Sequence, residues 1–72
     1  DLPKALDMAN KAIEQNAARK PFWIYHYKAK IQKDLGDKAG AIATANQSIT
    51  LAKEAKNDNY VTMNEKLIKE MN

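Results

Sequence analysis

The feature that most constrains the fold of this 72-residue chain is an internal repeat with an offset of 36 residues. Residues 1–13, DLPKALDMANKAI, align without a gap over residues 37–49, DKAGAIATANQSI. The same offset continues through the second half of each unit, where Ile31 falls on Leu67. A period between 20 and 50 residues is typical of stacked repeat proteins, whose units bury their apolar faces against one another. The sequence therefore predicts two similar units within a single domain, residues 1–72.

Start and stop signals predict two helices in the first unit. Asp1 is a suitable N-cap, and Pro3 lies in a first turn, where its missing N–H costs nothing. We expect this first helix to extend to about Asn16. The segment AARKP then interrupts the helical pattern, and Pro21 opens a second helix over about 22–35.

The second unit repeats these signals. Gly36 supplies the left-handed residue that ends the second helix. Asp37 is the expected cap of a third helix that extends to about Lys56, and Asp58 is the expected cap of a fourth helix that ends near Glu70. Because no window alternates as a strand would, the sequence predicts an all-α fold of four antiparallel helices joined by short loops.

Small and bulky residues follow different helices. Small side chains at i, i+4, i+7 and i+11 give one face on which another backbone can approach closely. Bulky side chains on the facing helices would fill the space between layers. The small stripes are Ala5, Ala9, Ala12 and Asn16 in the first helix and Ala41, Ala45, Ser48 and Ala52 in the third. The bulky stripes are Ile24, Tyr27, Ile31 and Leu35 in the second and Tyr60, Met63, Leu67 and Met71 in the fourth.

The segment LGDKAGAIATANQSITLA resembles the second half of a tetratricopeptide repeat. In that resemblance Gly36 and Asp37 form the turn within a repeat, Ala41 and Ser48 occupy the small positions of its second helix, and residues 22–35 form its first helix. The resemblance implies two tetratricopeptide-like helical hairpin units, a fragment of an α-solenoid. The period of 36 departs from the usual 34, and alanine stands where an aromatic residue is usual.

Two registers of the second helix are compatible with this resemblance. Anchored on the glycine turn, Ala29 takes the small position, but polar residues then fall on the apolar side. Anchored on the bulky stripe, Tyr27 and Ile31 face the core. We prefer the second register, because Met63 and Leu67 repeat it in the other unit.

A wider stretch, residues 22–70, resembles the helical C-terminal part of a family of uncharacterised bacterial proteins with an additional N-terminal domain. This resemblance implies no particular activity. Together with the start of the chain at an aspartate, it leads us to expect a fragment of a longer protein.

The candidate binding residues lie on the second and fourth helices. His26, Lys30 and Lys33 fall opposite the bulky stripe, and stacked first helices line the concave surface of a tetratricopeptide array. Phe22 and Trp23 have polar counterparts in the repeat, so the repeat itself does not require their apolar character. The candidate partner-binding residues are Phe22, Trp23, His26, Lys30, Lys33, Thr62, Lys66 and Lys69.

Three interpretations of the lysines remain open. Lys30, Lys33, Lys66 and Lys69 would form a basic strip along these two helices, and an acidic peptide, or one ending in a free carboxylate, would suit that strip electrostatically. A weak polyanion site, for a nucleic acid or an acidic surface, would use Lys28, Lys30, Lys33, Lys66 and Lys69. Lysine is also simply a good helix former on a solvated face. The net charge of +3 comes from interspersed signs, which argues against a nucleic-acid partner.

Composition argues against several other functions. The chain has no cysteine and one histidine, so it lacks the ligands of a structural zinc site, and we expect no metal and no cofactor. No nucleophile, base and orienting group occur in a recognisable pattern, and Ser48 is interpreted as a packing residue, so we expect no enzyme. No apolar run approaches the roughly 18 residues of a membrane span, and no targeting signal is present, so we expect a soluble protein. The compartment is left open, since the bacterial cytoplasm and periplasm are both compatible with the sequence.

The sequence thus favours a non-catalytic module for binding a protein or peptide. The small face of the first helix, Ala5, Ala9 and Ala12, is only partly covered by the second helix in such an arrangement. The remainder of a longer chain, or a second copy in a homodimer, could complete that cover, since repeat arrays usually need three or more units.

Overall fold

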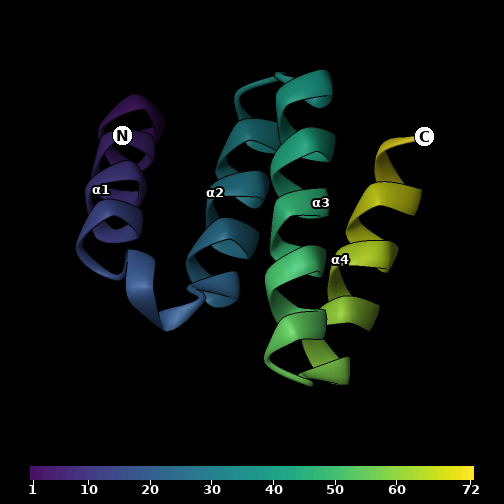
Figure 1. Ribbon diagram of the computed structural model, residues 1–72. Helices are drawn as coiled ribbons and strands as arrows, with labels where there is room; N and C mark the ends of the chain where they lie inside the picture. Colours follow the sequence, from purple (N-terminus) through teal and green to yellow (C-terminus); the bar gives the residue numbers. More distant parts are fainter.

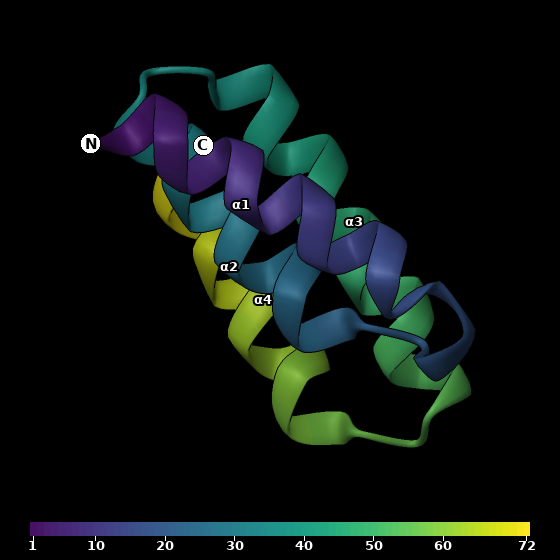
Figure 2. The same cartoon turned by 90° about the vertical axis from the view of Figure 1, so that its left-hand side faces the viewer.

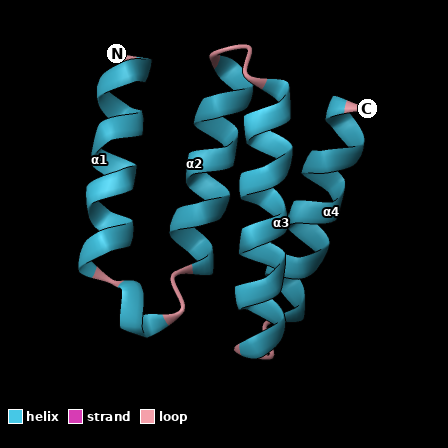
Figure 3. Cartoon of the chain, turned by 45° about the horizontal axis from the view of Figure 1, so that its top comes forward, coloured by secondary structure: helices cyan, strands magenta, loops and turns pink.

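Four α-helices and one short 3₁₀ turn make up most of the chain, and the computed structural model describes all residues from Asp1 to Asn72 (Figures 1 and 3). The elements are α1 (Leu2–Gln15), η1 (Ala17–Arg19), α2 (Phe22–Asp34), α3 (Lys38–Glu54) and α4 (Asp58–Met71). Figure 3 shows helices and loops without any strand. The predicted all-α fold with four helices is therefore confirmed.

The helix starts follow from side-chain caps. The Asp1 carboxylate accepts a hydrogen bond from the Lys4 N–H at 3.1 Å, and that of Asp37 accepts one from the Gly40 N–H at 2.9 Å, as the sequence predicts. The cap predicted for α4 is wrong by one residue. Asn57 is the N-cap, while Asp58 is the first helical residue. An asparagine caps as well as an aspartate, and the Asp58 carboxylate is still favourably placed in a first turn.

Two helices end in the same hydrogen-bonded motif. After α2, Gly36 is left-handed with φ of 84°, and the N–H groups of the two residues after Leu35 donate to carbonyls of the last turn. After α3, Lys56 takes this left-handed role with φ of 59°, and the Asn57 N–H donates to the Ala52 carbonyl at 2.8 Å. The third helix therefore ends at Glu54, earlier than expected, because the motif closes there without a glycine.

Helix α2 lies at the centre of the packing. It contacts α1, α3 and α4, and its most extensive contact is with α3, which also packs on α4. Figure 2 views the molecule from the α1 side, with α2 behind α1 and with α3 and α4 on either side of α2. The molecule measures 31 × 30 × 15 Å, so it is thin in one direction and has a small core.

The core consists of two clusters of small and bulky side chains. Between α1 and α2, Ala9 packs with Ile24 and Ile31. Among α2, α3 and α4, alanines from two helices receive bulky side chains from the fourth. This second cluster is Ala29, Ala41, Ala45, Leu67 and Met71. The expected meeting of small faces with bulky ones is therefore observed, and it allows these helices to approach closely.

The preferred register of the bulky stripe is wrong at three positions. Tyr27 is 54% exposed, Met63 is 43% exposed, and Leu35 also lies at the surface. Ala29 is completely buried instead, as the register anchored on the glycine turn predicts. The physical reason is the central position of α2. A helix with neighbours on three sides buries more than one stripe, and the side left open is the one that carries Tyr27.

Candidate partner-binding site

A groove lies between α2 and α4 and contains part of the predicted basic strip. It has a volume of about 280 Å³. Two residues of α2 and four of α4 line it: His26, Lys30, Met63, Lys66, Leu67 and Glu70. The structure thus brings together His26, Lys30 and Lys66 from the candidate set, and adds an apolar wall and one carboxylate that the sequence reasoning did not include.

A chain of buried hydrogen bonds holds the groove from beneath. Asn64 of α4 is completely buried, and its Nδ2 donates to Ser48 Oγ of α3 at 2.8 Å and to the Tyr60 carbonyl at 2.7 Å. Ser48 Oγ in turn donates to the Phe22 carbonyl of α2 at 2.7 Å. Because both donations use the Asn64 amino group, its Oδ1 is the acceptor for His26 Nδ1, which lies 2.7 Å away.

This arrangement defines the tautomer of the neutral His26 ring. Nδ1 must carry a hydrogen in order to donate to Asn64 Oδ1, so in the neutral ring Nε2 holds the lone pair. Nε2 has no partner within the chain, and it is not among the atoms sealed from solvent. The side chain is only 9% exposed, and His26 is one of the residues that line the groove.

The sequence reasoning placed His26 opposite the bulky stripe, as a candidate partner-binding residue, but it did not predict that the imidazole is buried. Helix α4 packs over that side and provides an acceptor in Asn64, which makes burial of the imidazole possible. The interpretation of Ser48 as a packing residue is incomplete for the same reason, since its hydroxyl bridges two helices.

Sequence reasoning missed Asn64, although the sequence contains a signal. Tyr60, Asn64, Leu67 and Met71 follow the i, i+4, i+7, i+11 spacing of one helix face. The sequence analysis assigned Met63 to the buried face of this helix, and Asn64 was therefore left out of that face. An asparagine in the middle of an apolar face is costly to bury without partners, so it predicts polar groups on the facing helices.

The remaining lysines of the predicted strip are placed differently. Lys33 forms an ion pair with Glu70, at 3.3 Å, which joins α2 to α4 at the groove. Lys30 and Lys66 make no ion pair and are exposed. Thr62 and Lys69 are exposed on α4 but do not line the groove, and Lys28 is half-buried outside it.

The two aromatic candidates at the start of α2 contact each other. Phe22 meets Trp23 edge to face at 5.1 Å between ring centroids, and it meets Tyr60 of α4 at 4.9 Å. Tyr60 also contacts the His26 ring edge to face at 5.6 Å. Phe22 thereby becomes part of the contact between α2 and α4, whereas Trp23 is directed to the other side, toward α1.

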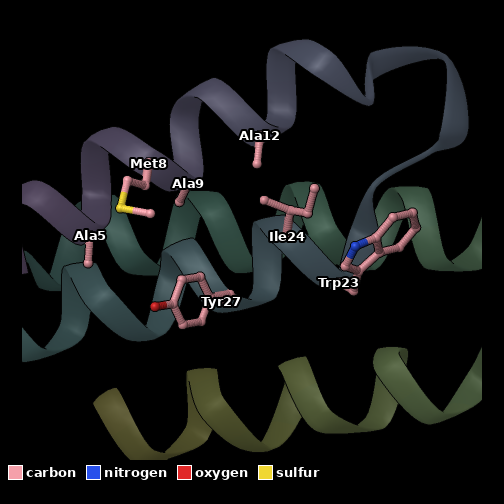
Figure 4. A pocket seen from close by; sticks show the side chains of 7 residues that line it. All are labelled: Ala5, Met8, Ala9, Ala12, Trp23, Ile24 and Tyr27. Atoms are coloured by element: carbon pink, nitrogen blue, oxygen red, sulfur yellow. The ribbon is translucent and has the colours of Figure 1, made fainter.

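Trp23 borders a second hollow, an apolar cavity of about 340 Å³ between α1 and α2 (Figure 4). All the residues that line it are hydrophobic, and the hydroxyl of Tyr27 and the indole N–H of Trp23 are the only hydrogen-bond donors among their side chains. The wall consists of Ala5, Met8, Ala9 and Ala12 from α1 and of Trp23, Ile24 and Tyr27 from α2. Figure 4 shows this cavity on the face where α1, α2 and α4 lie in front of α3. Part of the small face of α1 is thus open, as the sequence predicts.

Other kinds of site find less support in the geometry. Nowhere do three or more histidine, aspartate or glutamate side chains gather so that they could hold a metal ion. None of the helices combines the length and the apolar character needed to cross a membrane. Comparison with protein-family models, curated proteins and solved structures finds no match to this chain.

Proposed function

We propose that this chain is a non-catalytic protein-interaction module made of two tetratricopeptide-like hairpin units with antiparallel helices. The packing order supports the proposal, because α2 packs most extensively on α3, the helix that follows it after the Gly36 turn, and α4 packs on both. The left-handed Gly36 at the turn between α2 and α3, and the fully buried Ala41 and Ser48, agree with the resemblance in the sequence.

The groove between α2 and α4 is the proposed binding site, and an acidic peptide segment is the proposed ligand. One observation carries this assignment. Lys30 and Lys66, on different helices, line the same groove without an ion pair, while the nearby Glu70 is engaged by Lys33. A carboxylate in the groove would pair with ammonium groups that have no partner of their own.

Isothermal titration calorimetry with synthetic peptides tests the proposal. A glutamate-rich peptide should bind, and the matched glutamine peptide should not. Lys30→Gln and Lys66→Gln should each weaken binding by about 2- to 5-fold, the range expected for partly exposed charge pairs. Lys38→Gln, which removes an exposed lysine of α3 outside the groove, is the control and should leave the affinity unchanged.

A salt series separates this function from general polyanion binding. Peptide binding through two lysines should depend weakly on salt, whereas binding of single-stranded DNA or RNA through many phosphates falls steeply as salt rises. Tight, steeply salt-dependent binding of nucleic acid, together with no binding of acidic peptides, would overturn the proposal in favour of the polyanion site.

A further inference from the structure

The apolar cavity and the basic groove lie on one face of the molecule, on the two sides of α2. Trp23, Tyr27 and Lys30 follow each other at i, i+4 and i+7, so they form one exposed stripe along α2. Tyr27 borders the cavity toward α1, and Lys30 borders the groove toward α4. Figure 4 shows Tyr27 on the open face, in front of α3 and between the ribbons of α1 and α4.

We infer that the peptide recognised by this module carries a bulky apolar side chain that enters the cavity between α1 and α2, next to an acidic residue that binds in the groove between α2 and α4. The inference rests on the proposed function and specifies the partner. The cavity, about 340 Å³ in volume, has room for one aromatic or branched side chain. It is open at the rim, where Met8 is 66% exposed.

Charge favours an acidic peptide over a second copy of this chain as the occupant. A two-fold contact centred on this face would place the same patch of both copies together. The unpaired Lys30 and Lys66 of one copy would then meet those of the other, and like charges in a contact are costly. A partner with carboxylates removes that cost, and His26, whose Nε2 has no partner within the chain, also lines the groove.

The geometry also predicts the spacing of the two anchoring side chains. Each hollow lies between two neighbouring helices, so their centres are roughly one helix-to-helix distance apart, about 8–10 Å. A peptide bound in a polyproline II conformation has three residues per turn and rises about 3.1 Å per residue, so residues three positions apart lie on the same side, about 9 Å from each other. The apolar and the acidic residue should therefore be about three positions apart.

Calorimetry with the intact 72-residue chain and three peptides tests this inference. The first peptide carries phenylalanine about three positions from glutamate, the second has alanine in place of the phenylalanine, and the third has phenylalanine directly beside glutamate. Burial of the ring should make the first peptide about tenfold or more tighter than the second. The third should bind like the second, because its ring cannot reach the cavity.

Variants of the cavity complete the test. Ala5→Leu, at a half-buried position of α1, should fill the cavity and remove the advantage of the phenylalanine peptide without changing the affinity for the alanine peptide. Met8→Ser, at an exposed position of the rim, should reduce that advantage and still fold if Ala5→Leu does not. Ala43→Leu, at an exposed position of α3, is the matched control and should change neither affinity.

The outcomes separate the inference from the proposed function. Equal affinities for the first two peptides, with both weakened by Lys30→Gln, would overturn the cavity assignment and leave the proposed function standing. No binding of any acidic peptide would overturn both. Dimerisation seen by analytical ultracentrifugation, abolished by Met8→Ser and unaffected by peptide, would assign the cavity to a second copy and overturn the inference.

Discussion

The substitution Asn64→Ala tests the buried hydrogen-bond chain that joins α2, α3 and α4. Asn64 is completely buried, and its amide makes hydrogen bonds with His26, Ser48 and the Tyr60 carbonyl. Alanine removes all of these bonds. The Ser48 hydroxyl keeps its donation to Phe22, but His26 Nδ1–H is left in a buried position without an acceptor.

The expected cost follows from these contacts. An unsatisfied buried donor costs about 1–3 kcal/mol, and the space left by the amide adds about 1 kcal/mol. The better helix propensity of alanine returns about 0.5 kcal/mol. We therefore expect a loss of about 1.5–3.5 kcal/mol in the free energy of unfolding. Small domains have about 0.05–0.15 kcal/mol of stability per residue, so this loss is a large share of the total.

Urea denaturation followed by far-UV circular dichroism measures this loss. Asn46→Ala is the matched control, because Asn46 is an exposed asparagine within α3, and its replacement should change stability by no more than about 0.5 kcal/mol. A double-mutant cycle with Ser48→Ala should show a coupling of at least about 0.5 kcal/mol. Equal stabilities of the two asparagine variants, or strict additivity in the cycle, would refute the reasoning.

Three further predictions concern helix ends and core packing. Gly36→Ala should lower the free energy of unfolding by about 1–2 kcal/mol, because a residue with a Cβ is strained at φ of 84°, although that Cβ would meet no neighbouring atom. Lys56→Gly should be neutral or stabilising, because glycine adopts the left-handed conformation without strain. Chemical denaturation of both variants checks that the two effects have opposite signs. Ala45→Leu should cost about 1–3 kcal/mol by overpacking between α2, α3 and α4, while Ala43→Leu on the exposed side of α3 should be close to neutral in thermal melts. Asn57→Ala should cost about 1 kcal/mol through loss of the α4 cap, and an unchanged midpoint in urea would contradict the assignment of that cap.

The sequence predicted the helices because the signals for helix ends are local. A cap and the N–H that it binds are three residues apart, as in Asp37 and Gly40, so the pattern can be read directly from the chain. The left-handed residue at Gly36 is equally local. Lys56 shows the limit of this reasoning, since a lysine gives no sign that it will adopt φ of 59°.

The candidate site was predicted only in part. Lys30 and Lys66 were placed on a common strip by the 36-residue repeat, and the structure brings both to one groove. The apolar cavity between α1 and α2 was foreseen only as an open face of small residues. The shape of this cavity depends on how side chains of α2, among them Trp23 and Ile24, pack against α1. The periodicity within either helix does not predict contacts between the two helices.

The sequence by itself determined that there are four helices, the starts of α1 and α3 and the glycine turn after α2, and that small faces meet bulky ones, because capping and helical periodicity act over one or two turns. Tertiary structure alone decided which sides of α2 are buried. Three neighbours enclose that helix, so Ala29 and His26 turn inward and Tyr27 turns outward. The hydrogen bond between His26 and Asn64 joins residues 38 positions apart, and its existence depends on how α2 and α4 pack rather than on any local pattern.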